Sequence, residues 1–154
     1  MDRSAQTNPG MAGFGGLIRD FDGQFMRGFH GNIGYSNILH AEILALMHGI
    51  QICWDEGLRD IICYTDSMHT IHLVQYADVS THHYGNEITI IRKYMAKDWT
   101  FQLRHTPREG NMCVDFLAKL GTRSTSDLLI VLNPSAELRL LLMADSMGVA
   151  YHRG

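Results

Sequence analysis

Four acidic residues occupy positions at which a carboxylate could take part in chemistry. Asp66 follows the short apolar run at residues 61–64, so it stands at the carboxyl end of an expected buried strand. In open sheets, ligands bind outside the carboxyl ends of the strands. Glu42 and Asp115 are each flanked by apolar residues in segments with helical spacing, and Asp2 lies shortly before an Asn-Pro-Gly loop. These carboxylates are the first candidates for a reactive or metal-binding site.

The chemistry of such a group depends on whether the carboxylates meet. A carboxylate on an apolar helix is costly to bury unless it is paired or binds a cation. Several carboxylates at one sheet edge cannot all stay ionised without divalent cations, and such cations prefer hard oxygen ligands. Taken singly, Asp66 is also explained as the cap of the next helix, and Asp115 as a favourable charge in the first turn of a helix. Both interpretations stay open at this point.

Hydrophobic periodicity predicts the elements that would position these residues. An antiparallel hairpin is expected first, because two apolar runs flank the turn at residues 20–23. Apolar residues at three- and four-residue spacing then predict a helix that contains Glu42, and the run before Asp66 predicts a strand buried on both faces. In chain order the expected elements are strand 14–19, strand 24–30, helix 38–57, strand 60–65, helix 68–76, helix 87–96, strand 99–104 and helix 111–120.

The order of these elements predicts the fold class. Antiparallel strands come first and strands joined by helical crossovers follow, which is typical of a mixed α/β domain. Asn111 is expected to cap the last helix of this series, and Gly121 to end it. The remaining expected segments are a loop at 31–37, a connection at 77–86, a linker at 122–127, an apolar segment at 128–132 and a last helix from residue 134 to about 148.

Composition limits the class of protein. At 154 residues the chain suits one domain, and 45% hydrophobic with 19% charged residues is an ordinary soluble composition. The net charge of −3 argues against holding nucleic acid through a bulk positive field, so such a partner would need local basic residues or metal ions. The three cysteines form no C-x-x-C pair, so we expect free thiols in a reducing, intracellular compartment, nucleus or cytoplasm. No apolar run approaches a membrane span, and no membrane association is expected.

Two other kinds of site are disfavoured. The nine histidines include His69 and His72 on one expected helix, but no cysteine lies at zinc-finger spacing. Gly13, Gly15 and Gly16 lie within an expected hairpin strand and not in a strand-to-helix turn, which argues against a dinucleotide loop. We therefore expect neither a structural zinc ion nor an organic cofactor.

Four motifs in a fixed order resemble those of one family. They lie at residues 2–20, 40–46, 65–67 and 105–119 and read DRSAQTNPGMAGFGGLIRD, HAEILAL, TDS and HTPREGNMCVDFLAK. With these motifs the chain resembles the ribonuclease H family, in the branch associated with reverse transcriptases of plant retroelements. The resemblance covers residues 2 to about 121, which implies an RNase H-like domain at 1–121 and a C-terminal appendage at 122–154.

The resemblance implies a fold and an activity. The fold is the ribonuclease H-like α/β fold, a mixed sheet with antiparallel hairpin strands, then parallel strands, and helices on both faces. The activity is metal-dependent endonucleolytic hydrolysis of RNA in RNA–DNA hybrids with two Mg²⁺ ions, which Mn²⁺ could replace. The residues that match the family's metal-binding acids are Asp2, Glu42, Asp66 and Asp115, and the residue that matches its mobile histidine is His105.

The same resemblance implies where the hybrid binds. Asn8 matches a position that contacts the substrate backbone, Ser67 is expected to cap a helix and also to reach phosphate, and Arg3 could contact phosphate. Arg3 stands where the family normally has glycine. Only Met1 precedes Asp2, so the first strand is expected to be truncated. RNA would be distinguished through its 2′-hydroxyls, with little sequence specificity.

The leading hypothesis is therefore a hybrid nuclease, acting as a free protein or as part of a retroelement polyprotein. The alternative is a catalytically silent nucleic-acid-binding or assembly domain, a relic of a retroelement. An ordinary structural α/β module would leave the four ordered motifs unexplained.

Overall fold

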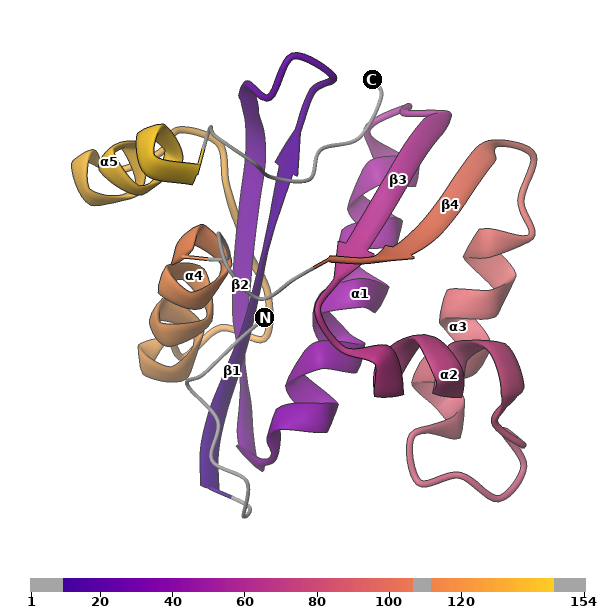
Figure 1. The fold of residues 1–154 in the computed structure, drawn as a ribbon. Helices are drawn as coiled ribbons and strands as arrows, with labels where there is room; N and C mark the ends of the chain where they lie inside the picture. Colours follow the sequence, from indigo (N-terminus) through magenta and orange to yellow (C-terminus); the bar gives the residue numbers. More distant parts are fainter. Residues whose placement is uncertain (1–9, 107–111, 146–154) are drawn as a thin grey trace.

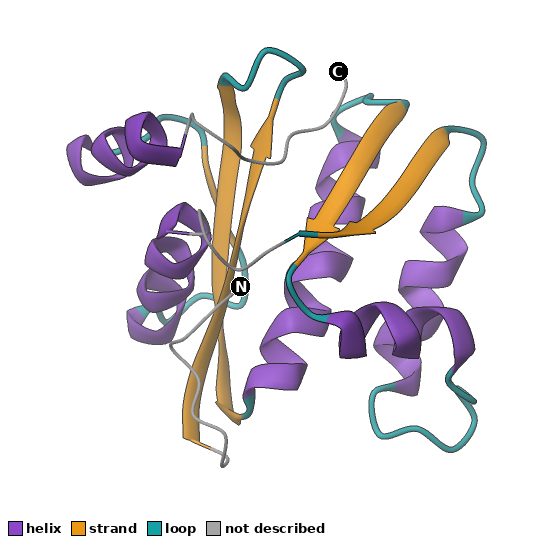
Figure 2. Cartoon of the chain, in the orientation of Figure 1, coloured by secondary structure: helices purple, strands orange, loops and turns teal. Residues whose placement is uncertain are grey.

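The computed structural model describes residues 10–106 and 112–145. The predictions for Asp2, Arg3 and Asn8, for Asn111 as a helix cap and for the end of the last helix beyond residue 145 lie outside the described residues. Within them the strands form two sheets, one antiparallel and one parallel, and helices pack against both (Figures 1 and 2). The fold is therefore the mixed α/β class that the sequence predicts.

An antiparallel hairpin forms the first part of the fold. It pairs β1 (Gly10–Arg19) with β2 (Phe25–Ser36). The carboxylate of Asp20 shapes the turn, because its Oδ1 accepts hydrogen bonds from the backbone N–H groups of Asp22 and Gln24 at 3.0 and 2.9 Å. Gly23 adopts a φ of 84°, which a residue with a side chain seldom takes. The turn predicted at residues 20–23 is confirmed.

Both hairpin strands are longer than predicted. The loop expected at residues 31–37 is wrong, because β2 continues to Ser36. Its glycines suggested a loop, but Gly31 is there for close packing: a Cβ on it would lie 2.0 Å from the carbonyl oxygen of Asp127. The segment at 124–127 thus passes directly over this strand, and the backbone N–H of Asn32 donates to the carbonyl of Ser126 at 2.8 Å.

The second sheet holds the strand that precedes Asp66. It pairs β3 (Asp60–Thr65) with β4 (Thr100–His105) in parallel, with Thr65 opposite His105. Exposure alternates along β4, as in a strand that is buried on one face.

Helix α1 (Ile38–Asp55) is the support that both sheets share. Its buried side chains Ala41, Ala45 and Ile52 contact Phe14 of β1 and Ile61 of β3 in one cluster. Another face of the same helix packs against the two helices that cover it, α2 (Met68–Tyr76) and α3 (Gly85–Met95). Figure 1 shows α1 between the hairpin and α3.

Helix α4 (Met112–Arg123) covers the opposite face of the hairpin (Figure 2). Gly121, which was predicted to end this helix, lies within it, so that prediction is wrong. A Cβ on Gly121 would lie 2.4 Å from the carbonyl oxygen of Gly31 and 2.8 Å from that of Phe14. Glycine is needed here for helix–strand contact and not for a helix stop.

The C-terminal segment extends the antiparallel sheet. β5 (Leu129–Val131) pairs antiparallel with β2, and α5 (Ala136–Asp145) begins two residues later than predicted. Leu138 of α5 is buried against Cys113 and Leu117 of α4. Other apolar side chains of this segment are exposed: Leu129, Ile130, Leu132, Leu140 and Met143.

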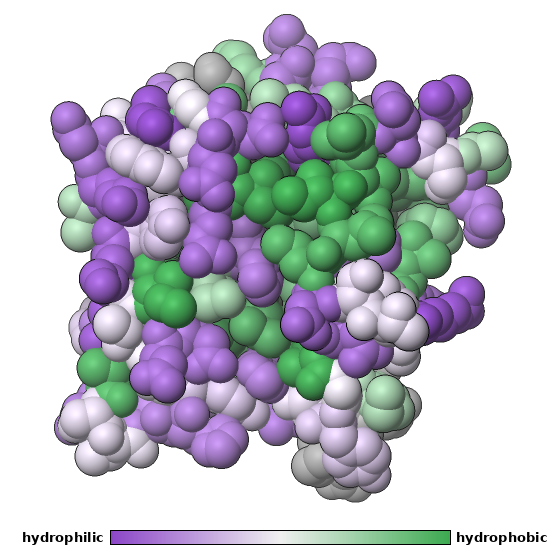
Figure 3. All heavy atoms as spheres, turned by 180° about the vertical axis from the view of Figure 1, so that it is seen from behind, coloured by the Kyte–Doolittle hydropathy of each residue, from purple (hydrophilic) through white to green (hydrophobic). Residues whose placement is uncertain are grey.

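Hydrophobic side chains gather on the face opposite to the view of Figure 1 (Figure 3). In the part of the chain that the structure describes, no helix combines the length and the hydropathy that a membrane span requires.

Candidate active site

The carboxyl ends of β3 and β4 place two of the predicted site residues side by side. Asp66 follows β3 directly, and His105 is the last residue of β4, opposite Thr65 in the ladder. The backbone N–H of Thr106 donates to the carbonyl of Thr65 at 2.9 Å, which continues the pairing past the strand ends. The His105 side chain is exposed, so it is available to a ligand at this edge.

Ser67 caps α2, as predicted. Its Oγ accepts hydrogen bonds from the backbone N–H of Thr70 at 3.0 Å and from the Thr70 hydroxyl at 2.9 Å. The backbone N–H of Ser67 in turn donates to Oγ1 of Thr65 at 3.1 Å. Thr65 and Thr70 are both buried, so these bonds fix the turn that carries Asp66.

Glu42 faces the same region from α1. Asn37 begins that helix with an extended backbone conformation, and its side chain accepts a hydrogen bond from the backbone N–H of His40 at 3.0 Å. Glu42 is half-buried on the first turns of the helix. It lines a surface hollow between the starts of α1 and α2, which we call the α1–α2 hollow. The residues around this hollow are Asn37, Ile38, Leu39, Glu42, Ser67 and His69.

Asp115 comes from another element than Glu42 and Asp66. It lies in the first turn of α4, next to the buried Cys113. Nη2 of Arg19, a residue only 2% exposed, lies 3.9 Å from Sγ of Cys113 and ties this turn to the end of β1. Oδ1 of Asp115 is buried, and so is Oδ1 of Asp66. Carboxylate oxygens are the ligands that hard divalent cations prefer.

The structure brings some predicted residues together and leaves others apart. Glu42 and Ser67 line one hollow, Asp66 adjoins Ser67, and His105 is one strand spacing away. Asp115 does not line that hollow. Within residues 10–106 and 112–145, no three acidic, histidine or cysteine side chains lie close enough to hold one metal ion. The four-acid metal site therefore stays a prediction.

A second polar group beside the hollow was not found from the sequence. Oγ of Ser36 lies 2.6 Å from Nδ1 of His40, and Nε2 of His40 lies 3.5 Å from Oε2 of Glu87. Burial lowers the pKa of His40, and the Glu87 carboxylate acts in the opposite direction. The four-residue spacing of Ser36 and His40 was a visible signal, but nothing in the sequence places Glu87 beside them.

One protein family matches most of the chain. The model of a family described as reverse transcriptase-like matches residues 1–121. A curated Arabidopsis thaliana protein named for ribonuclease H is 27% identical over 117 residues, which are 76% of this chain. The chain spans 19% of the length of that relative.

Solved structures share the fold. RNase H1 from the halophilic archaeon Halobacterium salinarum NRC-1 superposes with a TM-score of 0.68 and 24% identity, over 77% of this chain and 91% of that one. LC11-RNase H1, crystallised with an RNA/DNA hybrid, gives a TM-score of 0.67 and 23% identity, again over 77% and 91%. At these identities the likeness concerns the fold.

Proposed function

This chain belongs to the reverse transcriptase-like family and has a ribonuclease H-like fold; on that premise we propose that it binds RNA–DNA hybrids and hydrolyses their RNA strand with the help of divalent cations. The observation that carries the proposal is the meeting of Glu42 and Ser67 at one hollow, directly beside Asp66 at the end of β3. These are three of the residues that the family motifs single out.

The donor chemistry fits a hard divalent cation. Asp66 and Asp115 each present a buried carboxylate oxygen, and Glu42 is half-buried at the hollow. We propose that these three residues, together with Asp2, hold two Mg²⁺ ions, for which Mn²⁺ could substitute. Bound there, the ions would activate the attacking water and offset charge on the scissile phosphate and the leaving oxygen.

The remaining residues of the proposed site would contact the hybrid or transfer protons. Because Ser67 Oγ already accepts two hydrogen bonds, its own hydroxyl hydrogen is the group left to donate to a phosphate oxygen. The exposed imidazole of His105 can take up or release a proton during hydrolysis or product release. Arg3 and Asn8 are proposed to contact the hybrid backbone. Contacts to 2′-hydroxyls would select RNA over DNA.

The hybrid complex of LC11-RNase H1 supports this proposal by fold likeness, since that protein holds an RNA/DNA hybrid. Because this chain spans a fifth or less of its Arabidopsis relative, we also propose that such a domain works within a longer polyprotein of retroelement origin. We also propose a reducing intracellular compartment, in which Cys53, Cys63 and Cys113 would remain thiols.

Cleavage of an end-labelled RNA–DNA hybrid in the presence of Mg²⁺ tests the function. The unaltered chain is expected to shorten the RNA strand, and Asp66→Asn to be slower by about 100-fold or more, since changing even outer partners of metal ligands costs about 10–100-fold. Asp98→Asn is the matched control, because Asp98 is an exposed residue at the opposite end of the parallel sheet.

Equal rates for the unaltered chain and Asp66→Asn would contradict the catalytic assignment. Retained hybrid binding without any cleavage by the unaltered chain would identify the silent nucleic-acid-binding domain instead.

A further inference from the structure

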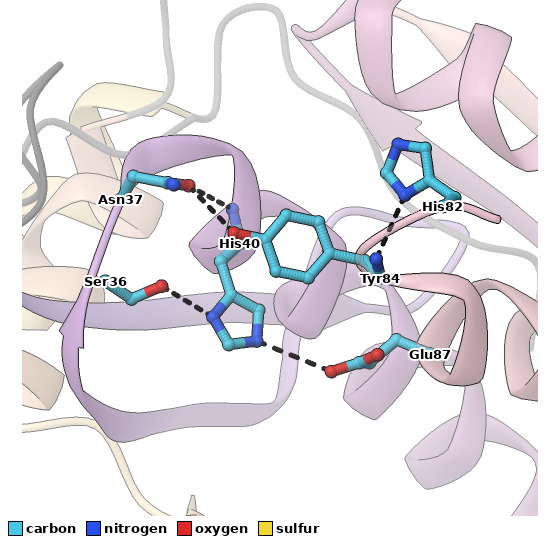
Figure 4. Close-up of polar contacts among 6 residues, drawn as sticks. All are labelled: Ser36, Asn37, His40, His82, Tyr84 and Glu87. Atoms are coloured by element: carbon cyan, nitrogen blue, oxygen red, sulfur yellow. Dashed lines mark hydrogen bonds and ion pairs between the residues drawn. The ribbon is translucent and has the colours of Figure 1, made fainter.

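A closed set of polar contacts holds the start of α1 against the start of α3 (Figure 4). Its members are Ser36 and Asn37 before α1, His40 in its first turn, and Tyr84 and Glu87 at the start of α3. We call these five residues the α1–α3 clamp.

Both ring nitrogens of His40 are used in the clamp. Nε2 faces the Glu87 carboxylate at 3.5 Å, which places the ring hydrogen on that nitrogen. Nδ1 then accepts from the Ser36 hydroxyl, at 2.6 Å. The ring also stacks on Tyr84, with 4.6 Å between centroids and 17° between planes. His40 is thus held on two edges and one face.

Tyr84 completes the clamp through the helix cap. Its hydroxyl lies 3.4 Å from Oδ1 of Asn37, the same oxygen that accepts from the backbone N–H of His40 at 3.0 Å. Tyr84 is itself buried, and its backbone N–H donates to Nδ1 of His82 at 3.0 Å. The anchor on the α3 side is therefore fixed as well.

The clamp borders the α1–α2 hollow, because its member Asn37 also lines the hollow. Ile38, Leu39 and Glu42 line the hollow from α1, whereas His40 is not part of its lining and points toward α3 (Figure 4). His40 holds the first turns of α1 in place. The same turns form one wall of the hollow, and Glu42 lies on that wall. Displacing a catalytic group by about 1 Å can cost about 100-fold in rate.

From this geometry we infer that His40 is a positioning residue: through Ser36, Glu87 and Tyr84 it sets the first turns of α1, and with them the placement of Glu42 for ion binding. The inference rests on the proposed function, because it assigns Glu42 to a bound cation. It adds a residue that touches neither the hybrid nor the ion, and it makes α3 part of the site's support.

His40→Phe tests the inference, because phenylalanine can keep the stacking on Tyr84 while it removes the hydrogen bond to Ser36 and the contact with Glu87. His72→Phe is the matched control: His72 is an exposed histidine on α2 whose ring also contacts a tyrosine, Tyr76, at 5.0 Å. Two quantities are measured on the full chain. They are the amide hydrogen exchange rates of residues 38–42 and the Mn²⁺ dissociation constant by electron paramagnetic resonance.

His40→Phe is expected to speed exchange in residues 38–42 and to raise the Mn²⁺ dissociation constant about 10-fold, with both unchanged in His72→Phe. Unchanged exchange, or faster exchange with unchanged Mn²⁺ affinity, overturns the inference and leaves the proposed function standing. Absence of Mn²⁺ binding by the unaltered chain overturns both.

Should His40→Phe fail to fold, Ser36→Ala carries the same test, since it removes one hydrogen bond at the strand end. The same two changes, smaller in size, are expected of it, and their absence overturns the inference.

Discussion

Ser67 caps α2 and is proposed to contact phosphate, and substitution can separate these two roles. Ser67→Ala removes the cap of α2 and is expected to lower the free energy of unfolding by about 1 kcal/mol. Aspartate caps helices as well as serine does, so Ser67→Asp should keep that stability, while its carboxylate repels phosphate and weakens hybrid binding. Urea unfolding and fluorescence anisotropy measure the two effects. Hybrid binding by Ser67→Asp at the original strength would show that Ser67 does not face phosphate.

His48 is expected to make stability depend on pH. Its ring stacks on Phe14 with 5.0 Å between centroids, and burial lowers its pKa. The unfolded chain therefore takes up a proton on this residue below about pH 6.5, before the folded chain does. Stability contributed by neutral His48 is present above that pH and is lost as the pH falls toward the folded pKa. Burial lowers the pKa of His30 too, with the same sign.

The free energy of unfolding is thus expected to decrease from about pH 7 to about pH 5, and to decrease less in His48→Phe. Urea titrations at both pH values measure the two slopes. Identical slopes would mean that His48 does not contribute.

At the scale of the elements, Arg92 fastens α3 to the end of α2. Its guanidinium donates to the carbonyl oxygens of Val74 at 2.7 Å, Ala77 at 2.8 Å and Leu73 at 3.3 Å. These are carbonyls at a helix C-terminus, where a positive charge is also favourable. Arg92→Ala is expected to cost about 1.5–3 kcal/mol of unfolding free energy, the range for hydrogen bonds to charged groups.

Lys93→Ala provides the comparison for Arg92→Ala in the same chemical denaturation experiment, because Lys93 is the neighbouring exposed cation. If both variants lose the same small amount, the carbonyl contacts of Arg92 add nothing to stability.

Helix α5 offers a second matched pair. Leu138 is 1% exposed and packs on α4, whereas Leu140 is 68% exposed. Leu138→Ala is expected to cost about 2–5 kcal/mol, and Leu140→Ala less than about 0.5 kcal/mol. Thermal or urea unfolding measures both. Such a difference would support treating 122–154 as an appendage packed on the domain, and equal small losses would indicate a segment that merely follows it.

At the scale of the whole molecule, periodicity predicted the elements that carry the site. The helix with Glu42, the strand before Asp66 and the helix capped by Ser67 are all present, because their apolar spacing reflects local burial. Gly31 and Gly121 misled the prediction. Both glycines allow close contact between segments that are distant in sequence, and no local pattern reveals such contacts.

The sequence could name candidate site residues but could not place them. The family motifs supplied Glu42, Asp66 and Asp115, and only the fold shows that Glu42 and Ser67 share a hollow that Asp115 does not line. The α1–α3 clamp depends on Tyr84 and Glu87, more than 40 residues from His40. Such pairings follow from how the helices pack and not from spacing along the chain.

The central claim is that this fold hydrolyses RNA paired to DNA, and strand selectivity tests it most directly. One sequence is prepared as an RNA–DNA hybrid, a DNA duplex and an RNA duplex, with each strand labelled in turn, and each is incubated with the full chain and Mg²⁺. Shortening of the RNA strand of the hybrid alone is the predicted result, because the proposed recognition uses 2′-hydroxyls on one strand. Equal cleavage of all three duplexes, or cleavage of the DNA strand in the hybrid, would contradict it.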